Sequence, residues 1–121
     1  MSKEKLYSED HIWVLYEDNI AVIGLSDYAQ KQLGTLAFIN LPEVGEKYQI
    51  GDVFGDVESI KTVSDLICPV DGEVVEVNES LIDNPENIDD TEASWLIKVC
   101  INSRPENLMD EAAYREKVVQ L

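Results

Sequence analysis

A single lysine lies in the segment VESIKTVSD, residues 57–65, between two runs rich in β-branched residues. Lys61 is the only basic residue between Lys47 and Lys98, in a stretch dense with aspartate and glutamate. A lone lysine on a solvated strand is most often only a surface charge. The first question is therefore whether the amine of Lys61 has a chemical function.

Four chemical roles are open to Lys61. A Schiff-base or general-base lysine needs burial to lower its pKa, and a turn between Glu58 and Asp65 offers the opposite surroundings. A phosphate-binding lysine follows a glycine-rich loop at the start of a helix, and residues 59–62 contain no glycine. A surface ion pair would contribute less than about 1 kcal/mol. The fourth role is attachment of a carried group, which requires an exposed amine on a rigid turn between strands, and this role fits the sequence best.

The elements that must position Lys61 are short strands. Residues 53–60 and 64–70 are both strand-like, so we expect Lys61 at the tip of a hairpin. We predict further strands at residues 12–16, 20–25, 36–42, 72–78 and 94–101, a turn, short strand and turn over 43–52, and an acidic surface loop with one helical turn over 78–94. Many short strands separated by frequent turns are typical of a small barrel or sandwich.

Two helices are predicted beside these strands. Ser26 can cap a short helix over residues 27–33. The tail from Pro105 is predicted to be helical, with Asp110 as a capping residue for 110–121. We expect this last helix to lie on the surface through a weakly apolar face that consists of Leu108, Ala112 and Val119.

Composition limits the classes of partner and cofactor. The 121 residues are enough for one domain, residues 1–121, with a modest core. A formal net charge of −16 disfavours nucleic acid and anionic membrane surfaces. With one histidine and two separated cysteines, we expect no metal site. The sequence begins with neither a signal peptide nor a transit peptide, and it has no apolar run that could span a bilayer, so we expect a cytoplasmic monomer.

The segment around Lys61 resembles the lipoyl-lysine hairpin of the H-protein family of the glycine cleavage system. The similarity runs in order from about Tyr7 to Tyr114, through the H-x-W of His11 to Trp13, IGLSDYAQKQLG (23–34), LPEVG (41–45), FGDVES (54–59), PVDGEVVEVNESL (69–81) and WLIKV (95–99). Biotin acceptors place methionines beside the lysine, whereas this chain has only Met1 and Met109. Lipoyl domains of 2-oxoacid dehydrogenases lack the DYAQ helix segment and the C-terminal helix. The resemblance implies a mainly β, lipoyl-domain-like barrel-sandwich hybrid with a short helix near 27–33 and a C-terminal helix.

The resemblance also implies a carrier that is not itself an enzyme. Lipoate would be attached covalently to Lys61 and would carry the aminomethyl group of glycine from glycine decarboxylase, the P protein, to the aminomethyltransferase, the T protein. Dihydrolipoyl dehydrogenase, the L protein, would then reoxidise the carrier. In this family the loaded arm folds back into a cleft on the carrier that excludes water.

Particular residues acquire expected roles from the same resemblance. Glu58 and Asp65 are expected to help a lipoylating enzyme recognise the hairpin, and Asp65 also to hold the protonated amine of the loaded arm. His11 is either an ordinary loop residue or one with a structural or docking role. We interpret four further residues as packing residues, namely Trp13, Tyr28, Leu33 and Trp95.

Three positions depart from the family pattern. Ile12 stands where the family commonly has a glutamate that faces the cleft, and DDTEASW, residues 89–95, is shorter than usual and contains no glycine. Cys68 replaces a small residue, and it is either a buried thiol or a group able to exchange with a dithiolane. These changes leave lipoylation of Lys61 untouched but put glycine as the source of the cargo in question. The alternative is an H-like paralogue that donates lipoyl groups to other carriers or serves as a lipoate-bound carrier in sulfur metabolism.

Overall fold

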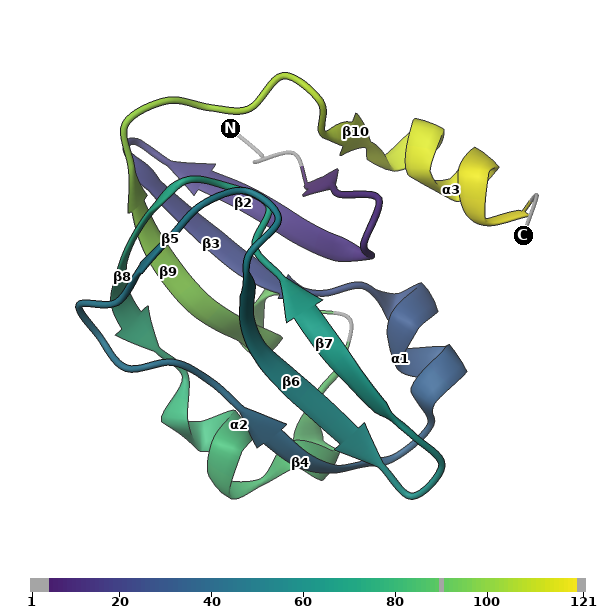
Figure 1. Ribbon diagram of the computed structural model, residues 1–121. Helices are drawn as coiled ribbons and strands as arrows, with labels where there is room; N and C mark the ends of the chain where they lie inside the picture. Colours follow the sequence, from purple (N-terminus) through teal and green to yellow (C-terminus); the bar gives the residue numbers. More distant parts are fainter. Residues whose placement is uncertain (1–4, 90, 120–121) are drawn as a thin grey trace.

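Two antiparallel β-sheets pack against each other in the computed structural model, which describes residues 5–89 and 91–119 (Figure 1). The strands are β1 (Leu6–Tyr7), β2 (Ile12–Glu17), β3 (Ile20–Leu25), β4 (Leu36–Asn40), β5 (Lys47–Tyr48), β6 (Val53–Ser59), β7 (Val63–Ile67), β8 (Gly72–Val77), β9 (Trp95–Ile101) and β10 (Met109–Asp110). The helices are α1 (Asp27–Leu33), α2 (Glu79–Asp83) and α3 (Glu111–Val119), with 3₁₀ turns η1 (Pro85–Asn87) and η2 (Glu92–Ser94). The larger sheet has the order β10-β1-β2-β3-β9-β8-β5 and the smaller one β4-β6-β7. The mainly β prediction is confirmed, as a sandwich whose sheets stay open rather than closing into a barrel.

The main core lies between the two sheets, because alternate side chains of each strand point inward. Val14 and Ile23 from the larger sheet meet Val57 and Leu66 from the smaller one, and all four are almost fully buried. A second apolar layer covers the other face of the larger sheet and consists of Tyr7, Trp13, Leu15, Val22 and Tyr114. The two layers explain why β2 is buried on both faces, although the outer face of an antiparallel sheet is commonly exposed to solvent.

The predicted short helix is confirmed at the expected residues. Ser26 is its N-cap, and the Ser26 hydroxyl accepts a hydrogen bond from the backbone N–H of Ala29 at 3.2 Å. Gly34 ends α1 with φ +79°, a conformation that favours glycine because it has no Cβ. The strands predicted at residues 12–16 and 20–25 are also confirmed, and they form a hairpin in which β2 and β3 pair from Ile12 opposite Leu25 to Glu17 opposite Ile20.

The ends of two strands, and the pattern of exposure along β8, differ from what the sequence suggests. β4 ends at Asn40 and β7 runs from Val63 to Ile67, so both finish earlier than expected. The strand predicted at 72–78 is present as β8, but it does not alternate between buried and exposed residues as a half-buried strand usually does, because a bulge between Val74 and Glu76 leaves Val75 41% exposed. The acidic segment after β8 is more structured than one helical turn, since α2, η1 and η2 all lie within it.

The C-terminal helix is present, but the prediction of its packing face was wrong. Residues 109–110 form the short strand β10, and α3 begins only at Glu111, with Asp110 Oδ1 accepting a hydrogen bond from the N–H of Ala113 at 2.8 Å. Val119, expected on the packing face, is 85% exposed. The residue that anchors the helix is Tyr114, which is fully buried and stacks on the ring of Tyr7 at a centroid distance of 4.3 Å. One large aromatic ring therefore replaces the weak aliphatic stripe that the sequence suggested.

Candidate functional site

Lys61 lies at the tip of the β6–β7 hairpin, in a turn that its own backbone holds in place (Figure 1). The N–H of Ser59 donates to the carbonyl of Thr62 at 2.9 Å. Ser59 is only 6% exposed, and its hydroxyl accepts hydrogen bonds from the N–H groups of Lys61 and Thr62, each at 3.2 Å. Ile60, Lys61 and Thr62 remain exposed. The turn is thus rigid at its base and open at its tip.

The strands below the turn are anchored in the core. Val57 and Leu66 are 0% and 1% exposed, and they hold β6 and β7 against the larger sheet. Leu36, three residues after the end of α1, pairs with Ser59 at the base of the turn. The end of α1 therefore lies beside the hairpin tip, and the position of Lys61 is fixed from two sides.

The Lys61 ammonium has no ion-pair partner within 4 Å in the part of the chain that the structure describes. Other lysines are engaged: Lys98 lies 3.5 Å from a carboxylate oxygen of Glu76, and Lys117 lies 3.3 Å from Glu9. An exposed amine that no described carboxylate holds keeps its conformational freedom and is accessible from solvent. This is the arrangement that attachment of a carried group requires.

Glu58 and Asp65 lie on the same outer face of the hairpin, although neither forms an ion pair with Lys61. Glu58 is opposite Val63 on β7, and Asp65 is opposite Asp56 on β6. Both side chains point away from the core, because their neighbours Val57 and Leu66 point into it. The structure brings the two predicted carboxylates together on one surface beside the lysine.

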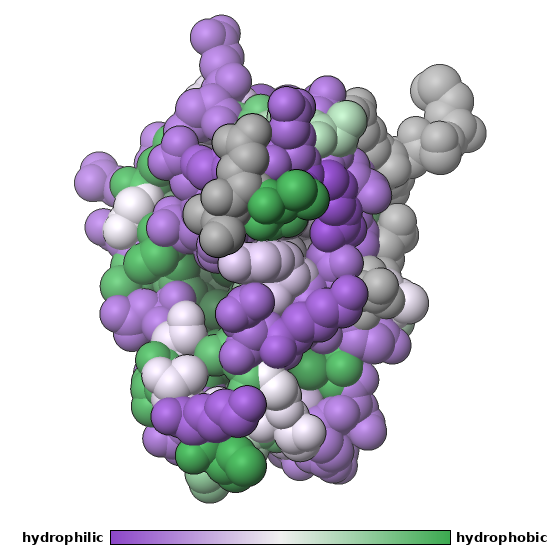
Figure 2. All heavy atoms as spheres, turned by 90° about the vertical axis from the view of Figure 1, so that its right-hand side faces the viewer, coloured by the Kyte–Doolittle hydropathy of each residue, from purple (hydrophilic) through white to green (hydrophobic). Residues whose placement is uncertain are grey.

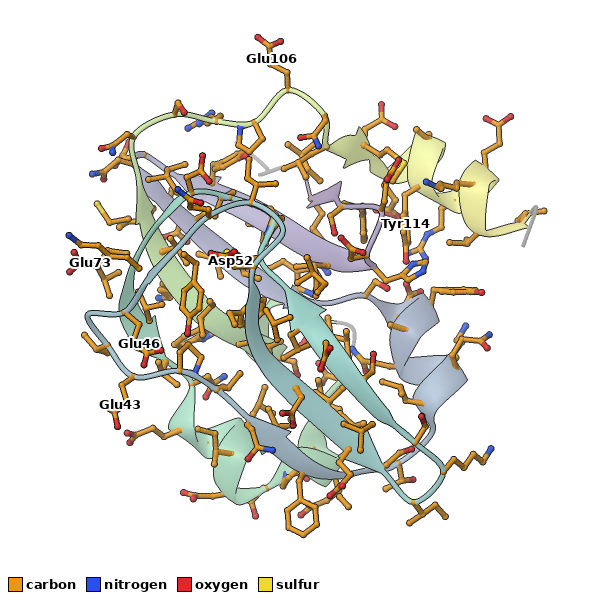
Figure 3. The ribbon with its side chains drawn as sticks, viewed as in Figure 1. Glu43, Glu46, Asp52, Glu73, Glu106 and Tyr114 are labelled. Atoms are coloured by element: carbon orange, nitrogen blue, oxygen red, sulfur yellow. The ribbon has the colours of Figure 1, made fainter. Side chains whose placement is uncertain are left out.

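His11 lies apart from this hairpin, in a network that fastens α3 to the larger sheet. It has φ +66°, and its Nδ1 lies 2.7 Å from the hydroxyl of Tyr114, the α3 residue labelled in Figure 3. The Tyr114 hydroxyl is in turn 2.8 Å from the hydroxyl of Ser26. The Tyr28 ring packs on the histidine at 4.9 Å. Burial lowers the pKa of His11, and Lys117 acts in the same direction against the opposing effect of Asp10. These contacts favour the structural role for His11 and the packing role for Tyr28.

Ile12 and Cys68, two of the positions that depart from the family pattern, are both buried. Ile12 is 1% exposed and contributes to the main core, so its side chain does not line an open surface. Cys68 is fully buried, and its thiol donates to the carbonyl of Val70 at 3.1 Å. Burial raises the pKa of Cys68 to about 11, which keeps the thiol protonated near neutral pH. The structure therefore supports the buried-thiol interpretation over exchange with a dithiolane.

The short segment before Trp95 is ordered by Asp89, a residue that sequence reasoning missed. The Asp89 carboxylate accepts hydrogen bonds from the N–H and the hydroxyl of Thr91, at 2.9 and 2.6 Å, and from the hydroxyl of Ser94 at 2.9 Å. Its carbonyl accepts from the Gln30 side chain on α1 at 2.7 Å. The bond from the Thr91 N–H to the Asp89 carboxylate forms an Asx turn, so the sequence signal for this order was the D-x-T pattern. Asp90, within the same segment, lies outside the described residues.

Residues 5–89 and 91–119 contain neither a metal-binding cluster nor a membrane-spanning helix. Among these residues, no group of three or more His, Cys, Asp and Glu side chains is arranged to hold a metal ion. Within the same ranges, no helix is both long and apolar enough to cross a membrane.

Comparison with known proteins gives one consistent result. A family model described as "Glycine cleavage H-protein" matches residues 5–121. Two relatives from strains of Staphylococcus epidermidis, both named "Glycine cleavage system H protein", are 44% and 43% identical over 116 residues, which cover 93% of this chain and 92% of each relative. The crystal structure of a glycine cleavage system H protein from Mycobacterium marinum matches with a TM-score of 0.90 and 36% identity, over 98% of this chain and 99% of that one.

Proposed function

We infer the role of this protein from its family: the chain belongs to the glycine cleavage H-protein family, and we propose that it carries a lipoyl group on Lys61. The observation that supports this proposal most directly is the exposed amine of Lys61, which has no ion-pair partner among the described residues, on a turn fixed by Ser59. The other predicted features of the hairpin, an anchored base and flanking carboxylates, are consistent with it.

The residues at the tip fit a covalent lipoyl group. The exposed Ile60 and Thr62 leave space around the lysine, and no carboxylate on the described part of the chain competes for its amine. In the attachment step the Lys61 amine loses a proton and forms an amide bond with the carboxyl carbon of an activated lipoyl donor, whose leaving group departs. When attached, the group supplies a dithiolane that alternates between disulfide and dithiol.

We propose that the carrier serves the three enzymes of the glycine cleavage system. Lys61 would present the aminomethyl group from glycine decarboxylase, the P protein, to the aminomethyltransferase, the T protein, and dihydrolipoyl dehydrogenase, the L protein, would restore the oxidised carrier. Asp65 would lie close enough to the arm to hold a cationic amine. The formal net charge of −16 would steer the carrier toward partners with basic docking surfaces.

A reconstituted glycine cleavage assay tests this proposal, with the lipoylated protein as the only carrier. Intact mass should first show one lipoyl increment, which Lys61→Arg abolishes while a matched Lys98→Arg variant keeps it. We expect turnover with the wild type and with Lys98→Arg, and none with Lys61→Arg. Absence of turnover from fully lipoylated wild type would contradict the glycine role and favour the relay or sulfur-carrier alternative.

A further inference from the structure

A small polar cavity lies between α3, β1 and the start of α1, and none of its lining residues belongs to the Lys61 hairpin. Its volume is about 170 Å³, and it is lined by six residues: Lys5, Tyr7, Trp13, Asp27, Glu111 and Arg115. A water molecule takes up about 30 Å³ in the liquid, so the cavity has room for a molecule of about five or six heavy atoms. Figure 2 faces the side of the molecule on which α1 and α3 lie, and hydrophilic residues predominate around α3 in its upper part.

The wall of the cavity carries two positive and two negative side chains. Arg115 Nη1 lies 2.6 Å from Asp27 Oδ1, so these two groups form a close ion pair. Glu111 is held less closely, because its Oε2 lies 3.8 Å from Arg115 Nε, beyond hydrogen-bond distance. A guanidinium has five N–H donors, and the contact with Asp27 occupies one of them. The Glu111 carboxylate and further N–H groups of Arg115 are therefore available to a ligand.

The Tyr7 hydroxyl is a third polar group with unused hydrogen-bonding capacity at this cavity. Tyr7 is only 2% exposed, yet its hydroxyl forms no hydrogen bond among the described residues. Burial raises the pKa of Tyr7, Glu111 adds to this effect and Arg115 opposes it, so the hydroxyl lies within electrostatic reach of both charged groups and stays protonated. A buried hydroxyl without a partner is unfavourable, and a ligand oxygen that accepts from it would remove this cost.

We propose that this cavity binds a small zwitterion of the α-amino acid class, whose carboxylate accepts hydrogen bonds from Arg115 and the Tyr7 hydroxyl and whose ammonium group donates to Glu111. A simple anion would be repelled by the two carboxylates of the wall, and a simple cation by its two basic side chains. A zwitterion is complementary to both halves of the wall at once. Tyr7 lies on β1 and the other two contacts lie on α3, so the ligand would join these two elements and stabilise the folded chain. This inference does not depend on the lipoyl group.

An NMR titration of the isotope-labelled full chain with glycine, the smallest member of the class with five heavy atoms, tests the proposal. The indole N–H of Trp13, a residue of the cavity wall, is the reporter, and the indole N–H of Trp95, which does not line the cavity, is the internal control. We expect saturable shifts at Trp13 and at the backbone amides of Tyr7 and Arg115, with a Kd on the order of 1 mM, and none at Trp95. Acetate and methylamine, which carry one charge each, should give no saturable shift at the same concentrations. Saturation by either of them as readily as by glycine, or no saturation by glycine, would overturn the proposal.

Two matched pairs of variants locate the ligand within the cavity. Tyr7→Phe breaks no hydrogen bond in the described structure, so it should fold like the wild type and weaken glycine binding at least about tenfold, whereas Tyr28→Phe should bind normally. Glu111 and Glu116 are both exposed glutamates of α3, but only Glu111 lines the cavity. Glu111→Gln should weaken glycine binding and allow acetate to bind, because the repelling charge is gone, and Glu116→Gln should do neither. Glycine affinities that are equal in each variant and its control would contradict the placement of the ligand.

Discussion

The hydroxyl of Tyr114 is the polar centre of the contact between α3 and the rest of the molecule, and its removal should have a measurable cost. The Tyr114 ring is fully buried, and its oxygen lies 2.7 Å from Nδ1 of His11 and 2.8 Å from the hydroxyl of Ser26. Tyr114→Phe keeps the ring and its stacking on Tyr7 but removes both hydrogen bonds. The substitution therefore isolates the polar part of the anchor.

The structure sets the size of the expected effect. The Ser26 hydroxyl still accepts from the N–H of Ala29 at 3.2 Å, so it keeps one partner. His11 Nδ1 has no second hydrogen bond among the described residues. An unsatisfied buried polar group costs about 1–3 kcal/mol. Because His11 is only half-buried, we expect Tyr114→Phe to lower the free energy of unfolding by about 1–2 kcal/mol.

Equilibrium urea unfolding measures this loss, with Tyr7→Phe as the matched control. Tyr7 supplies the other ring of the same stacked pair, but in the described structure its hydroxyl forms no hydrogen bond. We expect a lower midpoint for Tyr114→Phe at unchanged m-value, and a midpoint near wild type for Tyr7→Phe. Equal losses in the two variants would refute the hydrogen-bond argument and leave the anchoring of α3 to ring packing alone.

Three other perturbations have defined outcomes. Burial lowers the pKa of His11 from its ordinary 6.5, so the unfolded chain binds the proton more readily than the folded one. The free energy of unfolding should therefore fall as the pH drops below about 6.5. His11→Gln should make this fall smaller, as measured by urea midpoints between about pH 7.5 and 5.5. Ile12→Glu places a carboxylate in the core and should lower the free energy of unfolding by at least about 2 kcal/mol. The loss should be smaller at acid pH, where the buried carboxyl group is neutral. An unchanged urea midpoint would show that position 12 is open to solvent. Gly24→Ala would put a Cβ 2.2 Å from Cε2 of Trp13, so we expect a loss of about 1–3 kcal/mol with altered tryptophan fluorescence, and a native spectrum would contradict that contact.

The sequence was sufficient to predict the elements that local signals specify. Ser26 and Gly34 determine where α1 begins and ends, and both the β2–β3 hairpin and the β6–β7 tip follow from β-branched runs separated by turns. Lys61 could be predicted as the candidate residue because it is isolated in an acidic stretch and because its flanking residues resemble a known hairpin.

Features that depend on distant partners could not be predicted from the sequence. The packing of α3 depends on Tyr114 meeting Tyr7 and His11, more than a hundred positions away, while the local pattern suggested a different face. The exposure of Phe38 depends on strand register, and apolar residues usually predict burial. The bulge that exposes Val75 is likewise absent from the period-two pattern of β8.

The pairing of β1 with β10 has a consequence for how the chain is made. Leu6 pairs with Asp110, and Tyr114 on α3 belongs to the second apolar layer, so this layer is completed only after the chain has been synthesised beyond α3. Until then Trp13, Leu15 and Val22 have no cover from Tyr114, although the strands that carry them have already been synthesised. The interval before α3 is synthesised is therefore one in which these apolar side chains are open to aggregation, and packing of α3 against the sheet ends it.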